Sequence, residues 1–445
     1  MINNSKTYLN HSSFSLLKNW SVQYLLKETF LYNENFNLFP IGKFLIKNRD
    51  KVLIENGKEY KRVTVKINNK GVILRNIEKG ENIGTKQQYL IRSSQFIMSK
   101  IDARNGAFGL VPNNLNGAIV TNDFPVFNVD GKVINPEFLV LLTGTKEFVK
   151  FAQSCSSGTT NRQRININLF LNVKIPLPSL VEQNRIVDAY NNKINLAEKQ
   201  EEQASKKEQE IEEYLFEALG ITKQNQLIKN KKFRMIHFKD IDRWDVWINQ
   251  ELCISNKYKN TKLQSVVINK PVYGANVKGV KKITETRYIR ITDINETGSL
   301  NNAFVSPEFI EEKFLLKEDD FLIARSGNTV GKTFLYKEKF GRAIFAGYLV
   351  KYNLDTTKVL PEYILCFTKS YAYKKWIESN QRISGQPNIN AQEFLQSPIV
   401  LPPFKIQTEI VETIDKMKAE IRKLKVQTEN NRQQAIKDFE KEIFC

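Results

Sequence analysis

The stretch IPLPSLVEQNRIV at residues 175–187 decides the architecture of this chain, because a second version of it follows. The stretch IVLPPFKIQTEIV lies 224 positions later, at residues 399–411, and shares six of the thirteen residues. Further matches recur at spacings of 222 to 225, close to half of the 445 residues. A repeat of this extent predicts one module written twice, and missing it would mis-assign the whole fold.

Each copy of the repeated stretch leads into a long helix. Prolines are tolerated in a first helical turn, and Ser179 and Glu182 have the spacing of a capping box. Apolar residues then recur three and four apart, as in the narrow stripe of a coiled coil. About 40 residues at 1.5 Å each make a rod of about 60 Å. We expect the rods to pair through Ile186, Tyr190, Ala197, Ile211 and Leu215 in the first, and Ile410, Ile414, Met417, Ile421, Leu424 and Phe439 in the second.

The alternative interpretation of these helices is an ordinary amphipathic packing against a globular core. The narrow stripe, the length and the duplication favour paired rods. The order along the chain is then a domain with an N-terminal arm over 1–175, a spacer helix over 176–220, a second domain with a leading linker over 221–397, and a second spacer helix over 398–445.

Composition indicates a soluble globular protein with room for two to four domains, since 41% of the residues are hydrophobic and 26% are charged. No apolar run reaches the length of a membrane span, and the N-terminus lacks a signal-peptide core. The four cysteines lie far apart, so the sequence predicts neither disulfides nor a zinc site. These features favour a cytoplasmic protein, and the abundance of Asn, Lys and Ile favours an AT-rich bacterial genome.

The net charge of +19 is unevenly distributed along the chain. Residues 1–175 carry +12 and residues 221–397 carry +11, whereas the helical segments 176–220 and 398–445 carry −5 and +1. Two basic domains of similar charge predict a polyanionic partner such as double-stranded DNA. A general bias towards lysine is the alternative, but such a bias would have made the helices basic too.

Short β-type runs dominate each basic domain and a helix follows them. In the first domain they cover about 62–67, 71–75, 89–91, 96–99, 118–121 and 125–129. One helix is expected over about 136–153, and its counterpart over about 361–381. Strands followed by a helix predict two α+β domains separated by the long helices, which would form an antiparallel coiled coil.

One glycine-rich turn, SGNTVGKT at residues 326–333, resembles a phosphate-binding P-loop. That motif requires a glycine where Ser326 stands, and the matching residues 100–106 of the first copy contain no GK[ST]. A turn that brings Arg325 or Lys332 towards DNA phosphate suits the repeat better. The chain has only two histidines and no motif typical of a methyltransferase or nuclease, so we expect neither a catalytic residue nor a bound metal.

The duplicated basic domain, the proline-led entry and the long helix together resemble the specificity subunit of a type I restriction–modification system. The most specific pieces are the two repeated stretches, FLIARSGNTVGK at 321–332 and GQPNIN at 385–390. The resemblance implies two target-recognition domains, each reading one half of a bipartite DNA site, and a helical spacer that docks two modification (methyltransferase) subunits. It also implies restriction/translocase subunits, a role in phage defence, and S-adenosylmethionine and ATP bound by the partner subunits and not by this chain.

The residues expected to contact DNA lie in the duplicated turns and in the loops before the long helices. Arginine and lysine can bond guanine edges, and asparagine or glutamine can bond adenine, but the same side chains contact phosphates more often. For each of them a solvated surface charge is the alternative. A coiled-coil scaffold without DNA function and a stand-alone enzyme are the competing functions for the whole chain. The candidates are Lys100, Arg104, Arg162, Arg164, Arg325, Ser326, Lys332, Arg382 and Gln386.

Overall fold

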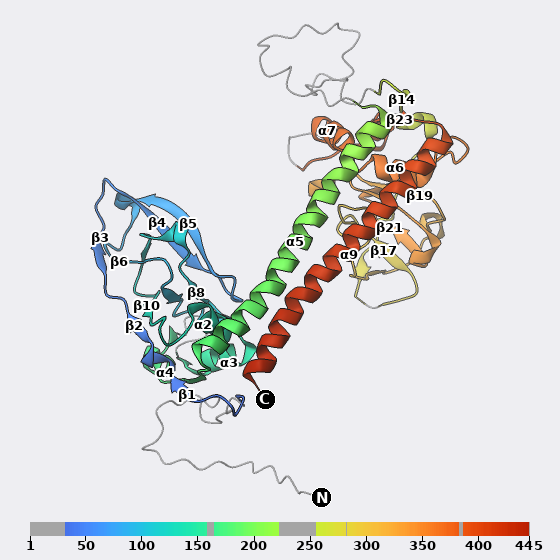
Figure 1. Ribbon diagram of the computed structural model, residues 1–445. Coiled ribbons are helices and arrows are strands. Elements are labelled where there is room, and N and C mark those ends of the chain that lie inside the picture. The colour runs from blue at the N-terminus through green and yellow to red at the C-terminus, as the bar shows by residue number, and fades with distance from the viewer. Residues whose placement is uncertain (1–31, 158–163, 222–254, 282, 382–385, 445) are drawn as a thin grey trace, which may run out of the picture. The chain divides into compact units, whose positions relative to one another are not determined.

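A computed structural model describes residues 32–157, 164–221, 255–281, 283–381 and 386–444 (Figure 1). The chain divides into two compact units, Met1–Lys199 with Gln427–Cys445 and Gln200–Val426. Each unit contains short strands, short helices and a part of each of two long helices. The α+β fold, the repeated domains and the long helices between them are therefore confirmed.

A four-stranded antiparallel sheet forms the centre of the first unit. Its strand β7 (Phe96–Met98) is buried on both faces. Because side chains alternate along a strand, Phe96 and Met98 join one apolar core and Ile97 joins another. The strand order is β2 (Leu45–Lys47), β10 (Val126–Val129), β7 and β8 (Phe108–Leu110).

A larger sheet of five strands completes the first unit. Its order is β3 (Lys51–Leu53), β6 (Gln87–Leu90), β9 (Ile119–Val120), β4 (Glu59–Val65) and β5 (Val72–Lys79). Two further antiparallel pairs join β1 (Leu38–Pro40) to β13 (Lys174–Pro176), and β11 (Ser156–Ser157) to β12 (Arg164–Ile165).

Among its described residues, the second unit repeats the four-stranded sheet but not the five-stranded one. The repeated order is β15 (Val272–Tyr273), β22 (Leu349–Asn353), β19 (Asp320–Ala324) and β20 (Thr333–Leu335). Pairing of β14 (Lys259–Lys262) with β23 (Pro398–Leu401) repeats the pair β1–β13. The remaining pairs are β16 (Gly279–Val280) with β18 (Ser306–Pro307), and β17 (Arg287–Ile289) with β21 (Ala343–Phe345).

The prediction of a single helix after the strands is wrong in both units, because two short helices occupy that segment in each. They are α2 (Pro136–Thr143) and α3 (Lys146–Ser154) in the first unit, and α6 (Pro361–Phe367) and α7 (Tyr371–Asn380) in the second. The reason is a cap in mid-segment: the Thr145 hydroxyl accepts from Phe148 N, and the Ser370 hydroxyl accepts from Tyr373 N. A capping hydroxyl favours a fresh helix start over continuation. Short helices α4 (Ile167–Leu171) and α8 (Ala391–Leu395) follow.

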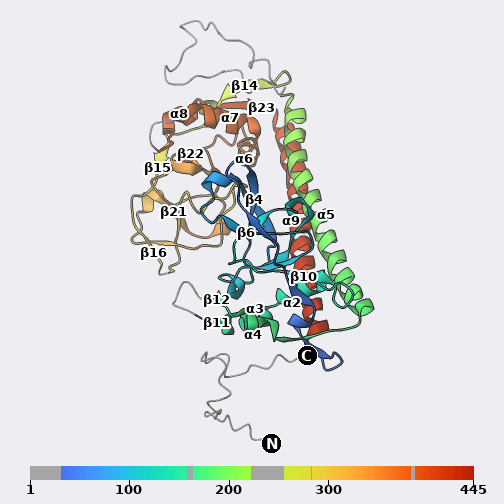
Figure 2. The ribbon, with the colours of Figure 1, turned by 90° about the vertical axis from the view of Figure 1, so that its left-hand side faces the viewer.

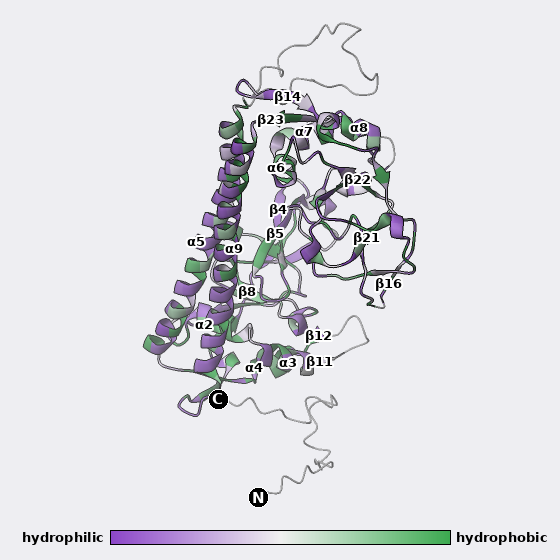
Figure 3. Cartoon of the chain, turned by 90° about the vertical axis from the view of Figure 1, so that its right-hand side faces the viewer, coloured by the Kyte–Doolittle hydropathy of each residue, from purple (hydrophilic) through white to green (hydrophobic). Residues whose placement is uncertain are grey.

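The long helices α5 (Leu180–Leu219) and α9 (Phe404–Ile443) run antiparallel within each unit (Figures 1 and 2). In the first unit Arg185 pairs with Glu442 at 3.0 Å, and Lys193 pairs with Asp438. In the second unit Lys207 pairs with Glu420, and Lys425 with Glu208, both at 2.6 Å. In the first unit the paired positions rise along α5 as they fall along α9, which is the antiparallel register. Figure 3 shows mostly hydrophilic residues along both helices, interrupted by hydrophobic ones.

The residues expected to pair the helices occupy two kinds of environment. Ala197 and Ile421 are buried in the middle part, where the Thr428 hydroxyl also donates to Ala197 O at 3.4 Å. Towards the helix ends, the side chains join the apolar cores of the two units. In the first unit these are Ile186, Tyr190 and Phe439, and in the second Ile211, Leu215, Ile410 and Ile414. Met417 and Leu424 are partly exposed.

The glutamine shared by the two repeated stretches has a structural role that is the same in both units. The buried side chain of Gln183 accepts from Asn135 N at 2.7 Å and donates to Pro178 O at 2.8 Å and Val133 O at 3.2 Å. It thereby joins the start of α5 to the segment that leads into α2. Gln407 makes the matching bonds in the second unit, to Leu360 N, Pro402 O and Lys358 O.

The C-terminal end of α9 closes against the first described residues of the chain. Tyr32 forms an antiparallel bridge with Phe444 and stacks on its ring, and Asn33 N donates to Ile443 O at 3.0 Å. In the second unit the end of α5 closes in the same way: Asn256 N donates to Gly220 O at 3.1 Å. Residues 1–31 of the expected arm and most of the expected linker lie outside the described part of the chain.

Candidate nucleic-acid interface

One arrangement of backbone hydrogen bonds recurs beside the four-stranded sheet of each unit. In the first unit Lys100 N donates to Asp123 O at 2.8 Å, and Ile165 N donates to Lys100 O at 2.9 Å. In the second unit Arg325 N donates to Tyr348 O at 2.9 Å, and Ile389 N donates to Arg325 O at 3.0 Å. We call Lys100, Asp123 and Arg164 the first junction, and Arg325, Tyr348 and Asn388 the second junction. The same frame therefore presents different side chains in the two units.

The first junction is rich in positive charge. Arg164 donates through Nε and Nη2 to the two carboxylate oxygens of Asp123, at 3.2 and 3.3 Å. Desolvation lowers the pKa of Lys100; the Asp123 carboxylate opposes this shift, and Lys47 and Arg164 add to it. Lys100 and Arg164 thus lie near the Asp123 carboxylate, and Lys47 adds a third positive charge near Lys100. Such a surplus attracts an anion such as a phosphate.

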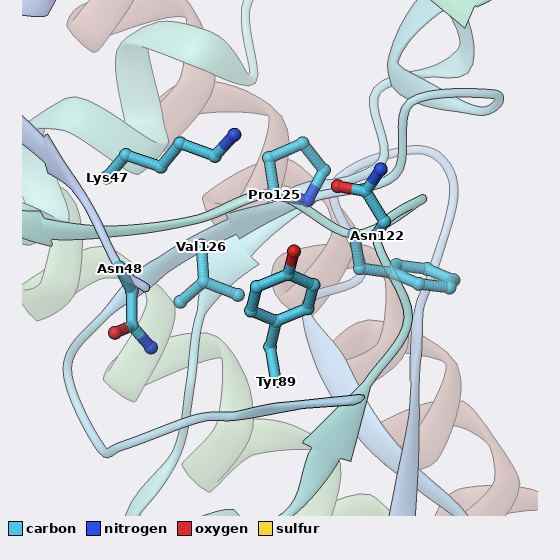
Figure 4. A pocket seen from close by; sticks show the side chains of 7 residues that line it. Lys47, Asn48, Tyr89, Asn122, Pro125 and Val126 are labelled. Carbon is cyan, nitrogen blue, oxygen red and sulfur yellow. The ribbon is translucent and has the colours of Figure 1, made fainter. Parts of the chain in front are cut away.

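A small pocket adjoins the first junction (Figure 4). Its polar lining includes Lys47, Tyr89 and Asn122, and its remaining lining residues are Asn48, Phe124, Pro125 and Val126. Figure 4 shows the Tyr89 hydroxyl directed towards Asn122 and Pro125, while the Asn48 amide points the other way. The side-chain amide of Asn48 is already hydrogen-bonded within the protein, because its Nδ2 donates to Leu90 O at 2.8 Å. The lysine, phenol and amide provide the donors and acceptors that a nucleotide can use.

The second junction is built around one arginine between two aromatic rings. The guanidinium carbon of Arg325 lies 5.0 Å from the ring centre of Tyr273 and 5.9 Å from that of Tyr348. Its Nε donates to Gly347 O at 3.3 Å, which fixes the plane of the group further. Within the described ranges, no carboxylate forms an ion pair with Arg325. Cation–π contact of this kind holds a guanidinium without neutralising it.

Two polar atoms next to Arg325 are buried and have no hydrogen-bond partner among the described residues. They are the Ser326 hydroxyl and the Asn388 side-chain oxygen, and the two residues face each other in an antiparallel bridge. Gln386 is also close, since a Cβ added to Gly327 would lie 3.1 Å from its Nε2. Buried polar groups in proteins are nearly always bonded, so each exception needs an explanation.

The other residues that the sequence predicts to contact DNA are less available for such a contact or lie outside the described residues. Lys332 pairs with Glu296 at 2.8 Å and its side chain is only 21% exposed. Arg104 lies at the 3₁₀ turn Ala103–Asn105 and is half-buried. Arg162 and Arg382 lie outside the described residues. The glycine-rich turn is followed by strand β20 and not by a helix, so it lacks the geometry of a P-loop.

Sequence reasoning missed Asp123, Tyr348 and Asn388 of the two junctions. It also missed three residues beside them, Lys47, Asn122 and Tyr273. One of the spacings of the repeat, 225, pairs position 123 with position 348, and the Asp and Tyr at these matching positions were a usable signal. Tyr273 reaches Arg325 only through the pairing of β15 with β22, which the sequence does not contain.

Metal binding and membrane insertion find no support in the part of the chain that the structure describes. There, no group of three or more His, Cys, Asp or Glu residues is arranged to hold a metal ion. None of the helices described combines the length and apolarity needed to cross a bilayer.

Comparison with known proteins agrees with the geometry. A family model described as "Type I restriction modification DNA specificity domain" matches residues 33–213 and 241–432. The StySPI specificity subunit of a type I restriction enzyme from Salmonella potsdam is 21% identical over 293 residues, a match spanning 64% of this chain and 59% of that relative. The chain thus covers less than two thirds of the length of this relative.

One solved structure shares the fold. A chain from work on the structural basis of complex assembly and conformational transition of the type I R-M system matches with a TM-score of 0.60 at 16% identity, covering 93% of this chain and 99% of that one. The HsdS subunit from Thermoanaerobacter tengcongensis matches with a TM-score of 0.46 at 15% identity, over 92% and 96% of the two chains.

Proposed function

Because the chain belongs to the type I restriction modification DNA specificity family, we propose that it is a specificity subunit that reads a bipartite DNA target. One half of the target would be read by each unit. The observation that carries this proposal is the recurrence of one backbone frame with different side chains at the first and second junctions. A duplicated frame with altered side chains suits two half-sites of different sequence.

Domain roles follow from the repeat. We assign target recognition to residues 1–175 and 221–397, and a spacer role to the helices over 176–220 and 398–445. The charges of +12 and +11 on the recognition segments support phosphate contacts, which position a reader on DNA but carry no sequence information. Antiparallel helices of 40 residues each would act as a ruler between the half-sites, as the subunit interface does in symmetric DNA-binding dimers.

Partners complete the proposed activity. The chain would dock two modification subunits that methylate adenine and, in a complete system, the restriction/translocase subunits. S-adenosylmethionine and ATP would be bound by those partners, and this chain would be the non-catalytic reader of a cytoplasmic complex. The sequence-wide scarcity of histidine, with His11 and His237 only, supports the non-catalytic role.

The test is a methylome. The full chain is co-expressed with its neighbouring methyltransferase in a host that lacks DNA methylation, and the DNA is sequenced with modification-sensitive reads. A split motif with methyladenine in both halves supports the proposal. The absence of methylation, despite good expression of both chains, would contradict it.

DNA binding by the purified complex separates a reader from a scaffold. A reader should lose affinity steeply as salt rises, because each neutralised phosphate releases counterions. Partner binding that is insensitive to salt, without affinity for DNA, would favour a coiled-coil scaffold. Hydrolysis of DNA or ATP by this chain alone would favour an enzyme.

A further inference from the structure

We propose that the second junction is the base-reading contact of the second unit, and that Arg325 reads a guanine there. This inference rests on the proposed function, since it presumes that the unit reads DNA. It goes further by naming the residue, the base and the groups that support the contact. The chemistry is the bidentate recognition of guanine O6 and N7 by a guanidinium in the major groove.

The surroundings of Arg325 restrict its side chain. Its Nε is used by Gly347 O at 3.3 Å, and the guanidinium lies over the rings of Tyr273 and Tyr348. These rings are 43% and 55% exposed, so the junction opens to solvent on the aromatic side. A planar fork that is held before binding loses little entropy when it bonds a base edge. The two terminal nitrogens, Nη1 and Nη2, have no hydrogen-bond partner among the residues described here.

Three lysines beside or within the same sheet are paired with carboxylates, whereas Arg325 forms no ion pair with a described residue. Lys332 pairs with Glu296 at 2.8 Å, and Lys351 pairs with Asp320 at 3.2 Å. Lys337 is 2.5 Å from carboxylate oxygens of both Asp319 and Glu362. A paired lysine would have to give up its partner before it could contact DNA. Among the residues that the structure describes, Arg325 has no such partner to give up.

Unpaired buried groups beside Arg325 supply the second, independent observation. Ser326 is only 5% exposed, and neither its hydroxyl nor the Asn388 side-chain oxygen has a partner in the described structure. Leaving a buried polar group unpaired destabilises the free protein. A ligand with donors and acceptors on a flat edge would satisfy both groups. Gln386, next to Gly327, adds an exposed amide to the same place.

The first junction differs at the matching position in a way that predicts a different base. There, Arg164 directs Nε and Nη2 at Asp123, so that this fork is already occupied. Lys100 stands where Arg325 does, and a lysine offers a point charge without a fork. The loss of one residue at the second junction should therefore change one half of the target and leave the other half unchanged.

The experiment is a selection from a random duplex library with the full chain bound to its modification subunits. Four variants are compared with the unaltered chain: R325Q, R325K, S326A and R342Q. R342Q is the matched control, because Arg342 is an exposed arginine of the same unit and lies outside the junction. The readout is the base preference at every position of the selected motif, together with affinity at several salt concentrations and the melting temperature.

We expect the unaltered chain and R342Q to select the same split motif, with a G·C pair in one half. R325Q and R325K should both reduce discrimination at that pair, by roughly 5- to 150-fold, because each lacks the planar fork. The other half should not change. S326A should keep or raise the melting temperature and still weaken binding to the selected site, because its hydroxyl is unpaired only in the free protein.

Other outcomes separate the two levels of inference. A chain that selects no split motif would contradict the proposed function itself. A split motif that R325Q and R325K leave unaltered would overturn only the guanine contact. Equal weakening on all sequences by R325Q, with recovery in R325K, would make Arg325 a phosphate contact and also overturn it. An S326A variant with unaltered affinity would remove Ser326 from the contact.

Discussion

The buried glutamine of the repeated stretch offers the sharpest test of why that stretch is repeated. Replacing Gln407 by alanine removes an acceptor 2.7 Å from Leu360 N and a donor 2.9 Å from Pro402 O and 3.4 Å from Lys358 O. A buried group left without a partner costs about 1–3 kcal/mol, and the loss spreads over one N–H and two carbonyls. We expect the free energy of unfolding of the second unit to fall by roughly 2–5 kcal/mol, since carbonyls tolerate the loss better than an N–H.

Hydrogen exchange read by mass spectrometry is the suitable assay, because it reports peptides from each unit separately and does not require two-state unfolding. The matched control is Gln396→Ala, which removes an exposed glutamine bonded to Lys262 Nζ and Gln264 Oε1 at the surface. It should cost less than about 0.5 kcal/mol. Gln183→Ala should reproduce the large effect in the first unit. If Gln407→Ala cost no more than Gln396→Ala, the glutamine would not be what joins the helix to its domain.

Three further predictions follow from particular contacts. Inserting four residues after Ala204 and another four after Ile421, near the ion pair of Lys207 with Glu420, should lengthen the proposed spacer by about 6 Å, or about two base pairs. The bases recognised in the two half-sites should stay the same. A methylome in which these bases change while the spacing holds would refute the proposal that the helices act as a ruler. Burial lowers the pKa of Lys369 from 10.5 to about 7. Between these values the unfolded chain binds one more proton than the folded chain, so the stability of the fold should rise with pH across that window. In thermal melts from pH 6 to 10, Lys369→Met should be more stable than the unaltered chain at low pH, and its stability should rise less as the pH increases. Ser370→Ala should destabilise the second unit by about 1 kcal/mol in exchange measurements, because the cap of α7 is lost, and an unaltered protection of α7 would count against the cap.

The sequence by itself determined the repeat, the class of fold and the long helices. These are local or periodic properties: a spacing near 224, an apolar stripe three and four apart, and proline and capping signals at the helix starts. Helix α5 begins at Leu180, where Glu182 N donates to the Ser179 hydroxyl, and ends at Leu219 before Gly220, whose φ of 63° suits glycine. Charge located along the chain also predicts which segments would contact a polyanion.

The break inside the short helices was within reach of the sequence, because Thr145 and Ser370 are residues that favour helix starts. Apolar periodicity on both sides of the break concealed it. The apolar stripe of the long helices was predicted to pair the two rods with each other, yet their ends pack into the cores of the two units. A stripe of apolar residues records that a face is buried, but not what buries it.

Only the tertiary structure decided which polar residues meet. Tyr273 contacts Arg325 from strand β15 and Tyr348 from the turn before β22, and Asn388 faces Ser326 across a bridge. Lys332 and Arg325 are equivalent in sequence terms, two cations of one glycine-rich segment, but Glu296 neutralises the first and two rings hold the second. Whether a charged side chain forms an ion pair depends on which residues strand pairing brings next to it. Local pattern carries no record of those partners, and this is why the fold could be predicted from the sequence while the junctions could not.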